Sequence, residues 1–262
     1  MGVAITSILP KKEITFQELQ GKKVAVDASN VIYQFLASIR QPDGTPLMDN
    51  NGNITSHLVG LASRVSNLME KNIKLAFVFD GKPPELKFEE SQRRRELKEK
   101  AQEKYDEAKE EDNKENMFKY SRQTIKLTKE IKEESKEFIK ALGIPVIQAP
   151  SEAEAQASFM AEKGDVFAVV SQDIDSLLYS TPILIRNLTV SSKKRIRGTY
   201  IKINPEIYDL NHVLKTLDIN KDQLLALSIL VGTDFNPGGV FRIGPKTALK
   251  LVQEHKSFEK IF

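Results

Sequence analysis

Short runs of apolar residues alternate along the chain with longer segments in which apolar residues recur at helical spacing. The runs at 23–27, 75–80 and 166–170 are too short for helices and predict buried strands. Helical spacing covers residues 28–39, 57–71 and 151–162. Because strands alternate with helices, we predict an α/β fold with a central, mostly parallel sheet and helices on both of its faces.

Other segments have weaker patterns. Residues 41–53 are rich in turn-forming residues and predict a hairpin or an exposed loop. Residues 182–210 predict one or two more strands with a basic turn at 193–197. Two further helices, joined by a glycine-rich link, are predicted at 220–231 and 245–255.

Residues 93–140 are different in kind. They hold 15 Lys/Arg and 13 Asp/Glu, more than half of the segment, and few apolar residues before Ile125. We predict one or two long, solvated helices here. Such a charge run is typical of a surface helical pair with ion pairs between residues four apart, and that interpretation stays open beside any functional one.

Composition narrows the possible chemistry. The 262 residues carry a net charge of +3 and no cysteine, which excludes disulfides, thiolate metal sites and thiol nucleophiles. The three histidines, His57, His212 and His255, are not spaced as metal ligands. No apolar run is long enough to cross a membrane and no secretory signal is visible. We therefore expect an intracellular protein with no membrane partner, in which carboxylates carry any catalysis.

Acidic residues stand where the predicted strands end. The carboxyl ends of parallel strands lie along one edge of a sheet, and ligands bind at that edge. Glu152 and Glu154, at the start of a predicted helix, and Asp234, two residues after Gly232, are expected to lie at the same edge. The carboxylates expected at this edge are Asp27, Asp80, Glu152, Glu154, Asp173, Asp175 and Asp234.

Each carboxylate also has a structural explanation. An aspartate after a strand is commonly a turn former or a helix N-cap. Ser151 and Glu154 fit a capping box, and Asp234 fits the start of a turn. Seven carboxylates at one edge would nevertheless repel one another unless cations neutralised them. Oxygen ligands favour Mg²⁺ or Mn²⁺, and two such ions about 3.5–4 Å apart would suit phosphodiester hydrolysis.

Several stretches are similar, in sequence and in order, to those of the flap endonucleases, structure-specific 5′ nucleases, in their archaeal and eukaryotic form. They include Val78-Phe-Asp-Gly-Lys-Pro-Pro84 and Ser171-Gln-Asp-Ile-Asp175. The full set covers residues 1–3, 26–29, 33–36, 54–58, 78–84, 149–156, 171–178, 230–239 and 243–246. The resemblance therefore extends from residue 1 to about residue 250.

The resemblance implies a PIN-like 5′-nuclease fold and one nuclease domain over 1–262. It implies that all seven carboxylates are ligands of two Mg²⁺ ions, with Mn²⁺ as a substitute. The expected reaction is hydrolysis of a phosphodiester near the junction between a single-stranded 5′ flap and duplex DNA, with 5′–3′ exonuclease activity. Its expected setting is Okazaki fragment processing in replication, and DNA repair.

Three further residues acquire catalytic roles through the resemblance. Lys87 and Arg94 are implied to stabilise the scissile phosphate, although seven residues apart they also fit a solvated pair on one helix face. Tyr33 is implied to stack on a base beside the cut. Its spacing in the first helix also fits core packing.

Two larger elements are implied as well. Residues 82–140 resemble the family's helical arch, through which a 5′ single strand threads, with Arg93, Arg95, Lys98, Lys100 and Lys104 steering phosphates. Residues 221–255 resemble its helix–two-turn–helix element, which grips duplex DNA and holds a monovalent cation in the loop 235–244. The DNA contacts implied there are Gly238, Gly239, Gly244 and Lys246.

The loop departs from the family at one point. Arg242 stands where the family has glycine, after Phe241, and a glycine of positive φ is poorly replaced by arginine. This puts the local geometry and the strength of duplex binding in question. The remaining DNA contacts implied by the resemblance are Gly2, Arg40, Thr55 and Arg64.

The family's C-terminal peptide, which docks on the sliding clamp, is not found in these residues, and we interpret the chain as C-terminally truncated. A monomer is expected, in the cytoplasm of a prokaryote or the nucleus of a eukaryote. Three alternatives stay open: a superfamily relative that cuts bubbles, four-way junctions or DNA ends; a DNA-junction binding module without catalysis; and a PIN-like ribonuclease.

Overall fold

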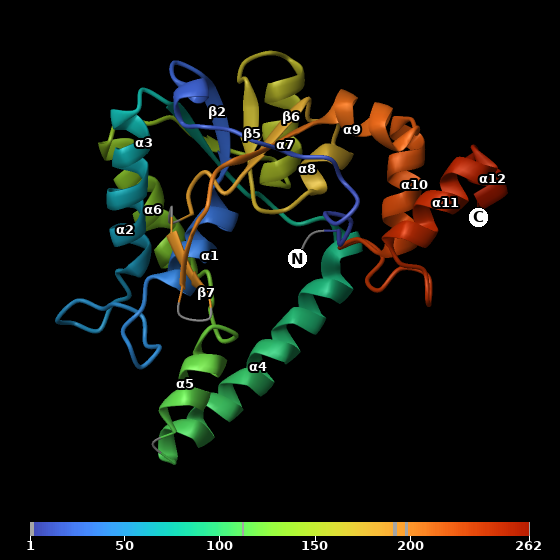
Figure 1. Ribbon diagram of the computed structural model, residues 1–262. Coiled ribbons are helices and arrows are strands. Elements are labelled where there is room, and N and C mark those ends of the chain that lie inside the picture. The colour runs from blue at the N-terminus through green and yellow to red at the C-terminus, as the bar shows by residue number, and fades with distance from the viewer. Residues whose placement is uncertain (1–2, 112, 191–192, 197–198, 262) are drawn as a thin grey trace.

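The computed structural model describes residues 3–111, 113–190, 193–196 and 199–261. A seven-stranded sheet of order β1-β9-β6-β5-β2-β3-β4 forms its centre (Figure 1). The strands are β1 (Lys12–Glu13), β2 (Lys23–Asp27), β3 (Lys74–Phe79), β4 (Val146–Gln148), β5 (Ala168–Val170), β6 (Ile183–Arg186) and β9 (Glu206–Asp209). The four pairs among β2 to β6 are parallel, and β9 runs antiparallel to β6 and β1. The predicted mostly parallel sheet is confirmed.

The stretch 182–210 is richer in strands than predicted. It holds β6, β9 and a separate antiparallel pair, β7 (Lys193–Ile196) with β8 (Thr199–Lys202). The basic residues predicted as a turn therefore lie in a strand, apart from Arg197, which is outside the described residues.

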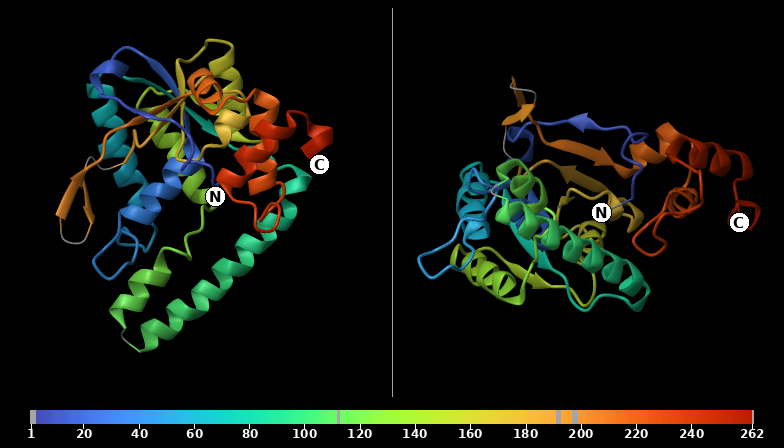
Figure 2. Two further views of the ribbon diagram at one scale, coloured as in Figure 1. Left: turned by 45° about the vertical axis from the view of Figure 1, so that its right-hand side comes forward. Right: turned by 90° about the horizontal axis from the view of Figure 1, so that it is seen from below.

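Helices cover both faces of the sheet, as predicted (Figure 2). Short helical turns occur at η1 (Gln17–Leu19) and η3 (Glu85–Lys87), and a π-helical turn, η2, at Leu61–Val65. The α-helices are α1 (Ala28–Ser38), α2 (Ser56–Gly60), α3 (Ser66–Glu70), α4 (Phe88–Glu110), α5 (Lys114–Ser121), α6 (Lys129–Ala141), α7 (Ala153–Glu162), α8 (Asp175–Leu178), α9 (Leu210–Leu217), α10 (Lys221–Val231), α11 (Pro245–His255) and α12 (Phe258–Ile261).

Strand periodicity divides the core into two clusters. Successive strand residues point to opposite faces, so Val24 and Val26 lie in one cluster and Ala25 in the other. Helices α1 and α6 contribute to the cluster of Val24, and helices α7 to α11 to the cluster of Ala25. Helix α7 turns alanines at 153, 157 and 161 toward the sheet, and such small side chains let a helix lie close to the strands.

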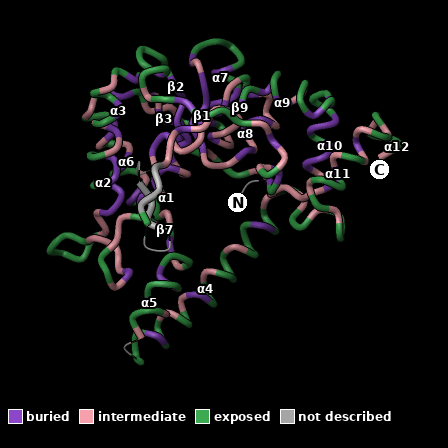
Figure 3. The backbone as a smooth tube through the Cα atoms, in the orientation of Figure 1, coloured by how far each residue is buried: buried purple, intermediate pink, exposed green. Residues whose placement is uncertain are grey.

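The predicted arch segment, 82–140, divides into two parts. Helices α4 and α5 pack on each other and project from the body, with mostly exposed side chains (Figures 1 and 3). Helix α6 instead buries Ile131, Ser135 and Ile139, spaced four apart, and packs against α2 and β4. The predicted solvated helices are thus α4 and α5.

None of the described helices is both long enough and apolar enough to span a bilayer.

His57 links two helices in the core and makes stability depend on pH. Its ring is fully buried, and Nε2 lies 3.1 Å from Glu134 Oε2 of α6. Burial lowers the pKa of His57 below its usual 6.5, against the opposing charge of Glu134. The folded state thus favours the neutral ring, so its contribution to stability is present above pH 6.5 and is lost as the pH falls below it.

Between pH 7.5 and pH 5.5 we expect the melting temperature of His57→Gln to change more favourably than that of the wild type, because the titrating ring is gone. The raised pKa values of Asp27 and Glu154 act in the opposite direction, and they do so equally in both proteins. Thermal unfolding followed by circular dichroism at both pH values measures the difference. His212→Gln, at an exposed histidine, is the matched control. Equal pH slopes in the two variants would contradict the prediction.

Candidate metal centre

Asp27 is the last residue of β2 and the N-cap of α1. Its Oδ1 accepts a hydrogen bond from the backbone N–H of Asn30 at 3.1 Å, so the structural explanation is correct for one of its oxygens. The side chain is buried, and burial raises the pKa of Asp27 to about 7. The negative charge of Asp80 acts in the same direction, which shows that the two carboxylates are neighbours.

Asp80, which follows β3, satisfies the start of α7. Its Oδ1 accepts a hydrogen bond from the backbone N–H of Ala153 at 2.9 Å. The predicted capping box is wrong: α7 begins at Ala153, Glu152 is its N-cap residue, and no side-chain cap bond comes from it. A carboxylate from another strand replaces the local serine.

The two glutamates at the start of α7 meet partners from other elements. Glu152 accepts hydrogen bonds from the hydroxyl of Tyr179 and from the Lys87 ammonium. Glu154 accepts one from Ser171 Oγ at 3.0 Å. Burial raises the pKa of Glu154 well above its usual value, and the charges of Asp27, Asp175 and Asp173 add to that shift.

Asp173 and Asp175 follow β5. The Asn30 side-chain amide donates to Asp173 Oδ2 at 3.0 Å, while the backbone N–H of Val3 donates to Asp175 Oδ1 at 2.8 Å. The chain near its N-terminus therefore reaches the same edge. Burial raises the pKa of Asp175, and the charges of Asp173 and Asp234 act in the same direction although the Val3 amide opposes them.

Asp234 is presented by the link between α10 and α11. Gly232 has a φ of 109°, and a Cβ there would lie 2.7 Å from the backbone N of Gly239, so the link can close only with glycine. Asn236 fastens the turn, since its amide donates to Ile229 O at 2.7 Å and its Oδ1 accepts from Thr233 N. Asp234 thus faces the edge where the other carboxylates lie.

Two cations of the charged segment point into this group. Lys87 lies against Glu152 and 3.5 Å from Asp234 Oδ2, and Arg94 Nη2 donates to Asp234 Oδ1 at 2.6 Å. The hydrogen bond and charge of Glu152 raise the pKa of Lys87, outweighing the opposing effect of its burial. Lys87 and Arg94 therefore stay charged and partly neutralise the carboxylates.

The structure thus brings all seven predicted carboxylates to one edge of the sheet. As they stand, no three Asp, Glu or His side chains among the described residues are arranged to hold a metal ion. At least one oxygen of each carboxylate is instead engaged by Lys87, Arg94 or a neutral donor. Even so, burial and mutual repulsion raise the pKa of Asp27, Glu154 and Asp175, which shows that these carboxylates lie close together and resist ionising side by side without a cation. A set of closely spaced carboxylate oxygens fits hard divalent cations.

Tyr33 lies on the surface rather than in the core. Its side chain is 38% exposed, and Lys98 Nζ of α4 lies 5.6 Å from the ring centroid. The prediction of core packing is therefore wrong, because the face of α1 that carries Tyr33 turns toward Lys98 in the middle of α4. The ring is available to a ligand between α1 and α4.

The residues expected to contact DNA are spread over several elements. Arg40 braces its own loop, donating to Leu36 O at 2.7 Å and to Gly44 O at 2.6 Å. Thr55 precedes α2, and Arg64 lies in the π-helical turn. Gly2 lies outside the described residues.

The link between α10 and α11 carries the other expected contacts. Gly238 and Gly239 have φ values of 86° and 57°, and Gly244 and Lys246 lie at the start of α11, with Lys246 exposed. Arg242 also adopts a left-handed φ, 64°. The arginine thus keeps the backbone that glycine would favour, at a cost of about 1–2 kcal/mol.

Four polar residues of the site were not predicted. Asn30 and Ser171 orient Asp173 and Glu154, Tyr179 binds Glu152, and Glu90 binds Arg94. Asn30, Ser171 and Tyr179 act on partners distant in sequence, and no spacing rule marks them. Two signals were nevertheless available: Asn30 and Ser171 lie within three residues of predicted ligands, and Glu90 lies four residues before Arg94, the spacing of an ion pair on one helix face.

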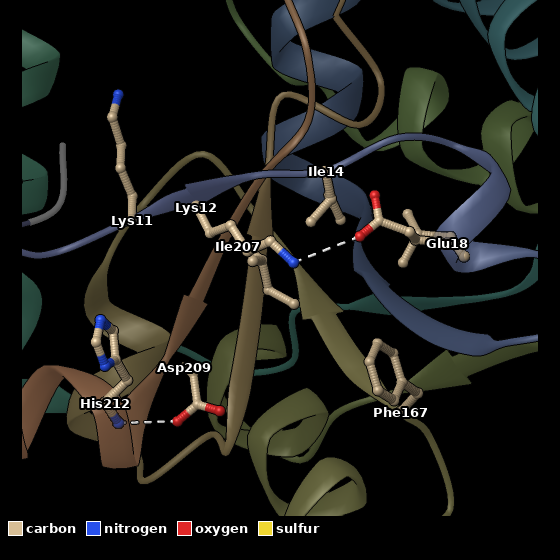
Figure 4. Close-up of a pocket in the computed structure, with 9 residues that line it drawn as sticks. Lys11, Lys12, Ile14, Glu18, Phe167, Ile207, Asp209 and His212 are labelled. Carbon is tan, nitrogen blue, oxygen red and sulfur yellow. Dashed lines mark hydrogen bonds and ion pairs between the residues drawn. The ribbon is translucent and has the colours of Figure 1, made fainter.

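A pocket also lies at the opposite edge of the sheet, near the amino ends of β5 and β6 (Figure 4). Its lining residues are Lys11, Lys12, Ile14, Glu18, Leu19, Phe167, Ile207, Asp209 and His212. None of the seven carboxylates is among them, so this pocket is separate from the candidate metal centre.

Comparison with known proteins agrees with this geometry. The model of the XPG N-terminal domain matches residues 1–101, and that of the XPG I-region matches residues 143–234. Flap endonuclease 1 of Pyrococcus horikoshii is 54% identical over 97% of this chain and 74% of its own length. The chain belongs to the flap endonuclease 1 family. All seven carboxylates lie inside the two matched ranges.

Solved structures of related proteins share the fold. Flap endonuclease-1 from Methanococcus jannaschii superposes with a TM-score of 0.76 at 46% identity, covering 97% of this chain and 77% of its own. The catalytic core of Rad2, solved in complex with a DNA substrate, gives 0.74 at 25% identity, covering 99% of this chain and 70% of its own. The predicted 5′-nuclease fold is confirmed.

Charge repulsion at the carboxylate edge is testable by thermal unfolding. Asp27→Asn keeps the helix N-cap but removes one buried charge. In EDTA we therefore expect its free energy of unfolding to exceed that of the wild type by about 1–2 kcal/mol, and its melting temperature to be a few degrees higher. Mg²⁺ should raise the melting temperature of the wild type more than that of the variant.

Asp165→Asn, at an exposed aspartate before the amino end of β5, is the control. It should change neither the melting temperature in EDTA nor the rise in melting temperature with Mg²⁺. A metal-free Asp27→Asn protein less stable than the wild type would show that repulsion does not govern this site.

Proposed function

We propose that this protein is a Mg²⁺-dependent, structure-specific 5′ flap endonuclease with 5′–3′ exonuclease activity. It cuts the phosphodiester near the junction of single strand and duplex in branched DNA, in Okazaki fragment processing and in repair. The observation that carries the proposal is the meeting of seven carboxylates with Lys87 and Arg94 at one edge of the sheet, in a member of the flap endonuclease 1 family.

The carboxylates divide into two groups in this proposal. Asp80, Glu152, Glu154, Asp173 and Asp175 hold two Mg²⁺ ions, or Mn²⁺, directly. Asp27 and Asp234 bind them directly or through water. When bound, the ions supply Lewis-acid activation of a water and stabilise the leaving oxygen.

Lys87 and Arg94 act on the phosphate. Both cations already share Asp234, Lys87 at Oδ2 and Arg94 at Oδ1. A phosphodiester at this edge would accept hydrogen bonds from the Lys87 ammonium and from the donors of Arg94 that Asp234 does not use, and the two side chains would stabilise the negative charge of the transition state. Tyr33 stacks on a base beside the cut, where its exposed ring lies below Lys98.

The remaining elements position the DNA. The predicted arch guides the single strand, with Arg93, Arg95, Lys98, Lys100 and Lys104 near its path. Gly238, Gly239, Gly244 and Lys246 of the link and of α11 hold duplex phosphates, with a monovalent cation in 235–244, and Gly2, Arg40, Thr55 and Arg64 add contacts. Phosphate contacts and DNA bending select shape rather than base sequence.

The proposal includes the state and place of the protein. It is a monomeric nuclease domain that works inside the cell, and a site whose residues all come from one chain is consistent with a monomer. The sliding clamp is the proposed partner, through the C-terminal peptide expected from the family. The chain spans about three quarters of the length of these relatives.

The decisive experiment is cleavage of an end-labelled 5′-flap DNA with Mg²⁺, with EDTA, and beside a linear duplex, a bubble, a four-way junction and an RNA flap. We expect Mg²⁺-dependent release of the DNA flap and little cutting of the linear duplex. If the protein cuts the bubble, the four-way junction or the RNA flap faster than the DNA flap, the proposed substrate is wrong and the preferred one takes its place. Asp175→Ala should abolish cutting yet bind the flap nearly as tightly, and lost binding would make Asp175 structural.

Lys87→Ala tests the phosphate contact. We expect the single-turnover cleavage rate to fall about 100-fold with little change in flap Kd, because a preorganised cation at the transition state is lost. Lys74→Ala, an exposed lysine at the amino end of β3, is the matched control. An unchanged rate in Lys87→Ala would remove this lysine from the site.

A further inference from the structure

Glu90 is a buried acid in a helix that is otherwise mostly exposed. Its side chain is 5% exposed, and the other buried residues of α4 are Ala101 and Ala108. Acidic side chains are rarely buried unless they are paired. Glu90 lies in the first turn of α4, beside the link that carries Asp234 (Figures 1 and 2).

Two arginines surround the Glu90 carboxylate. Arg93 donates through Nε to Oε2 at 2.7 Å and through Nη2 to Oε1 at 2.9 Å. Arg94 donates through Nε to Oε1 at 2.7 Å. The hydrogen bond from Arg93, and then that from Arg94, hold the pKa of Glu90 at about 2. The carboxylate is therefore charged at neutral pH.

Arg94 spans two carboxylates of different origin. Its Nε binds Glu90 on its own helix, and its Nη2 binds Asp234 Oδ1 on the body at 2.6 Å. A guanidinium has five N–H donors in a rigid plane, and these two bonds use two of them. The two donors on Nη1 lie in the same plane, on the edge of the guanidinium opposite to Nε, and they make no hydrogen bond to the part of the chain that the structure describes.

We infer that Glu90 is a positioning residue, which holds the Arg94 guanidinium at Asp234 with its Nη1 donors free for the scissile phosphate. This inference rests on the proposed nuclease function. Without Glu90, the long arginine side chain gains rotamers and pairs with Asp234 alone, so fewer of its conformations suit a phosphate.

A structural role is the competing explanation, because an acid in the first turn of a helix is stabilised by the helix dipole. Glu89 occupies the same turn and is exposed, so Glu89→Gln removes the same charge without touching the arginines. It is the matched control. The two explanations also differ in whether the effect of Glu90 needs Arg94.

The test is single-turnover cleavage of a 5′-flap DNA at saturating protein, with flap Kd and melting temperature measured for every variant. We expect Glu90→Gln to cut about tenfold more slowly, the loss of a charge-assisted hydrogen bond, with flap Kd within about twofold. Glu89→Gln should cut at the wild-type rate. In an Arg94→Ala background, Glu90→Gln should cause no further loss.

The outcomes separate the explanations. An equal loss from Glu90→Gln with and without Arg94 would overturn the inference, because Glu90 would then act through Arg93 or through helix stability. A rate equal to that of Glu89→Gln would overturn it as well. If Glu90→Gln is poorly folded, Glu90→Asp, which keeps the charge but shortens the reach to Arg94, takes its place in the same comparison. If the wild-type protein cuts no flap DNA, the proposed function itself is contradicted, and not only the role of Glu90.

Discussion

Negative charge held at one edge of the sheet is the constraint on which the rest of the molecule depends. Parallel strands β2, β3 and β5 end side by side, so the acids that follow them meet whatever their separation in sequence. Burial of Asp27 and Glu154 strengthens their repulsion because little water screens it. The neighbouring elements donate hydrogen bonds to these carboxylates. The donors are Asn30 of α1, Ser171 after β5, Tyr179 after α8, and the backbone N–H of Val3.

The base of α4 is attached to the body mainly by charge. Leu86 and Phe88, at the start of the helix, are 76% and 70% exposed, whereas Lys87 and Arg94 reach the carboxylates. An ion pair can exchange one partner for another, while apolar contacts must be unpacked. Under the proposed function, an attachment of this kind would let metal ions and phosphates exchange with these ion pairs while the core stays packed.

Two of the aspartates have a structural role beside the proposed metal-binding one. Asp27 caps α1 and Asp80 satisfies the start of α7, in each case through Oδ1. The helix starts in turn hold these side chains in place. A structural and a metal-binding explanation of a single aspartate compete when only the sequence is read, but they do not exclude each other, because a carboxylate has two oxygens that can accept different partners.

The sequence by itself determined the alternation of strands and helices, the parallel sheet and the edge where the acids gather, because apolar periodicity and the rule for parallel strands depend only on order along the chain. It also identified the family, through motifs that are local. Only the tertiary structure decided that Asp80 rather than Ser151 satisfies α7, that Tyr33 is exposed, that α6 belongs to the body, and that Glu90 and Tyr179 join the site. These outcomes depend on partners far apart in sequence or on which helix face is covered, and a local pattern reports neither.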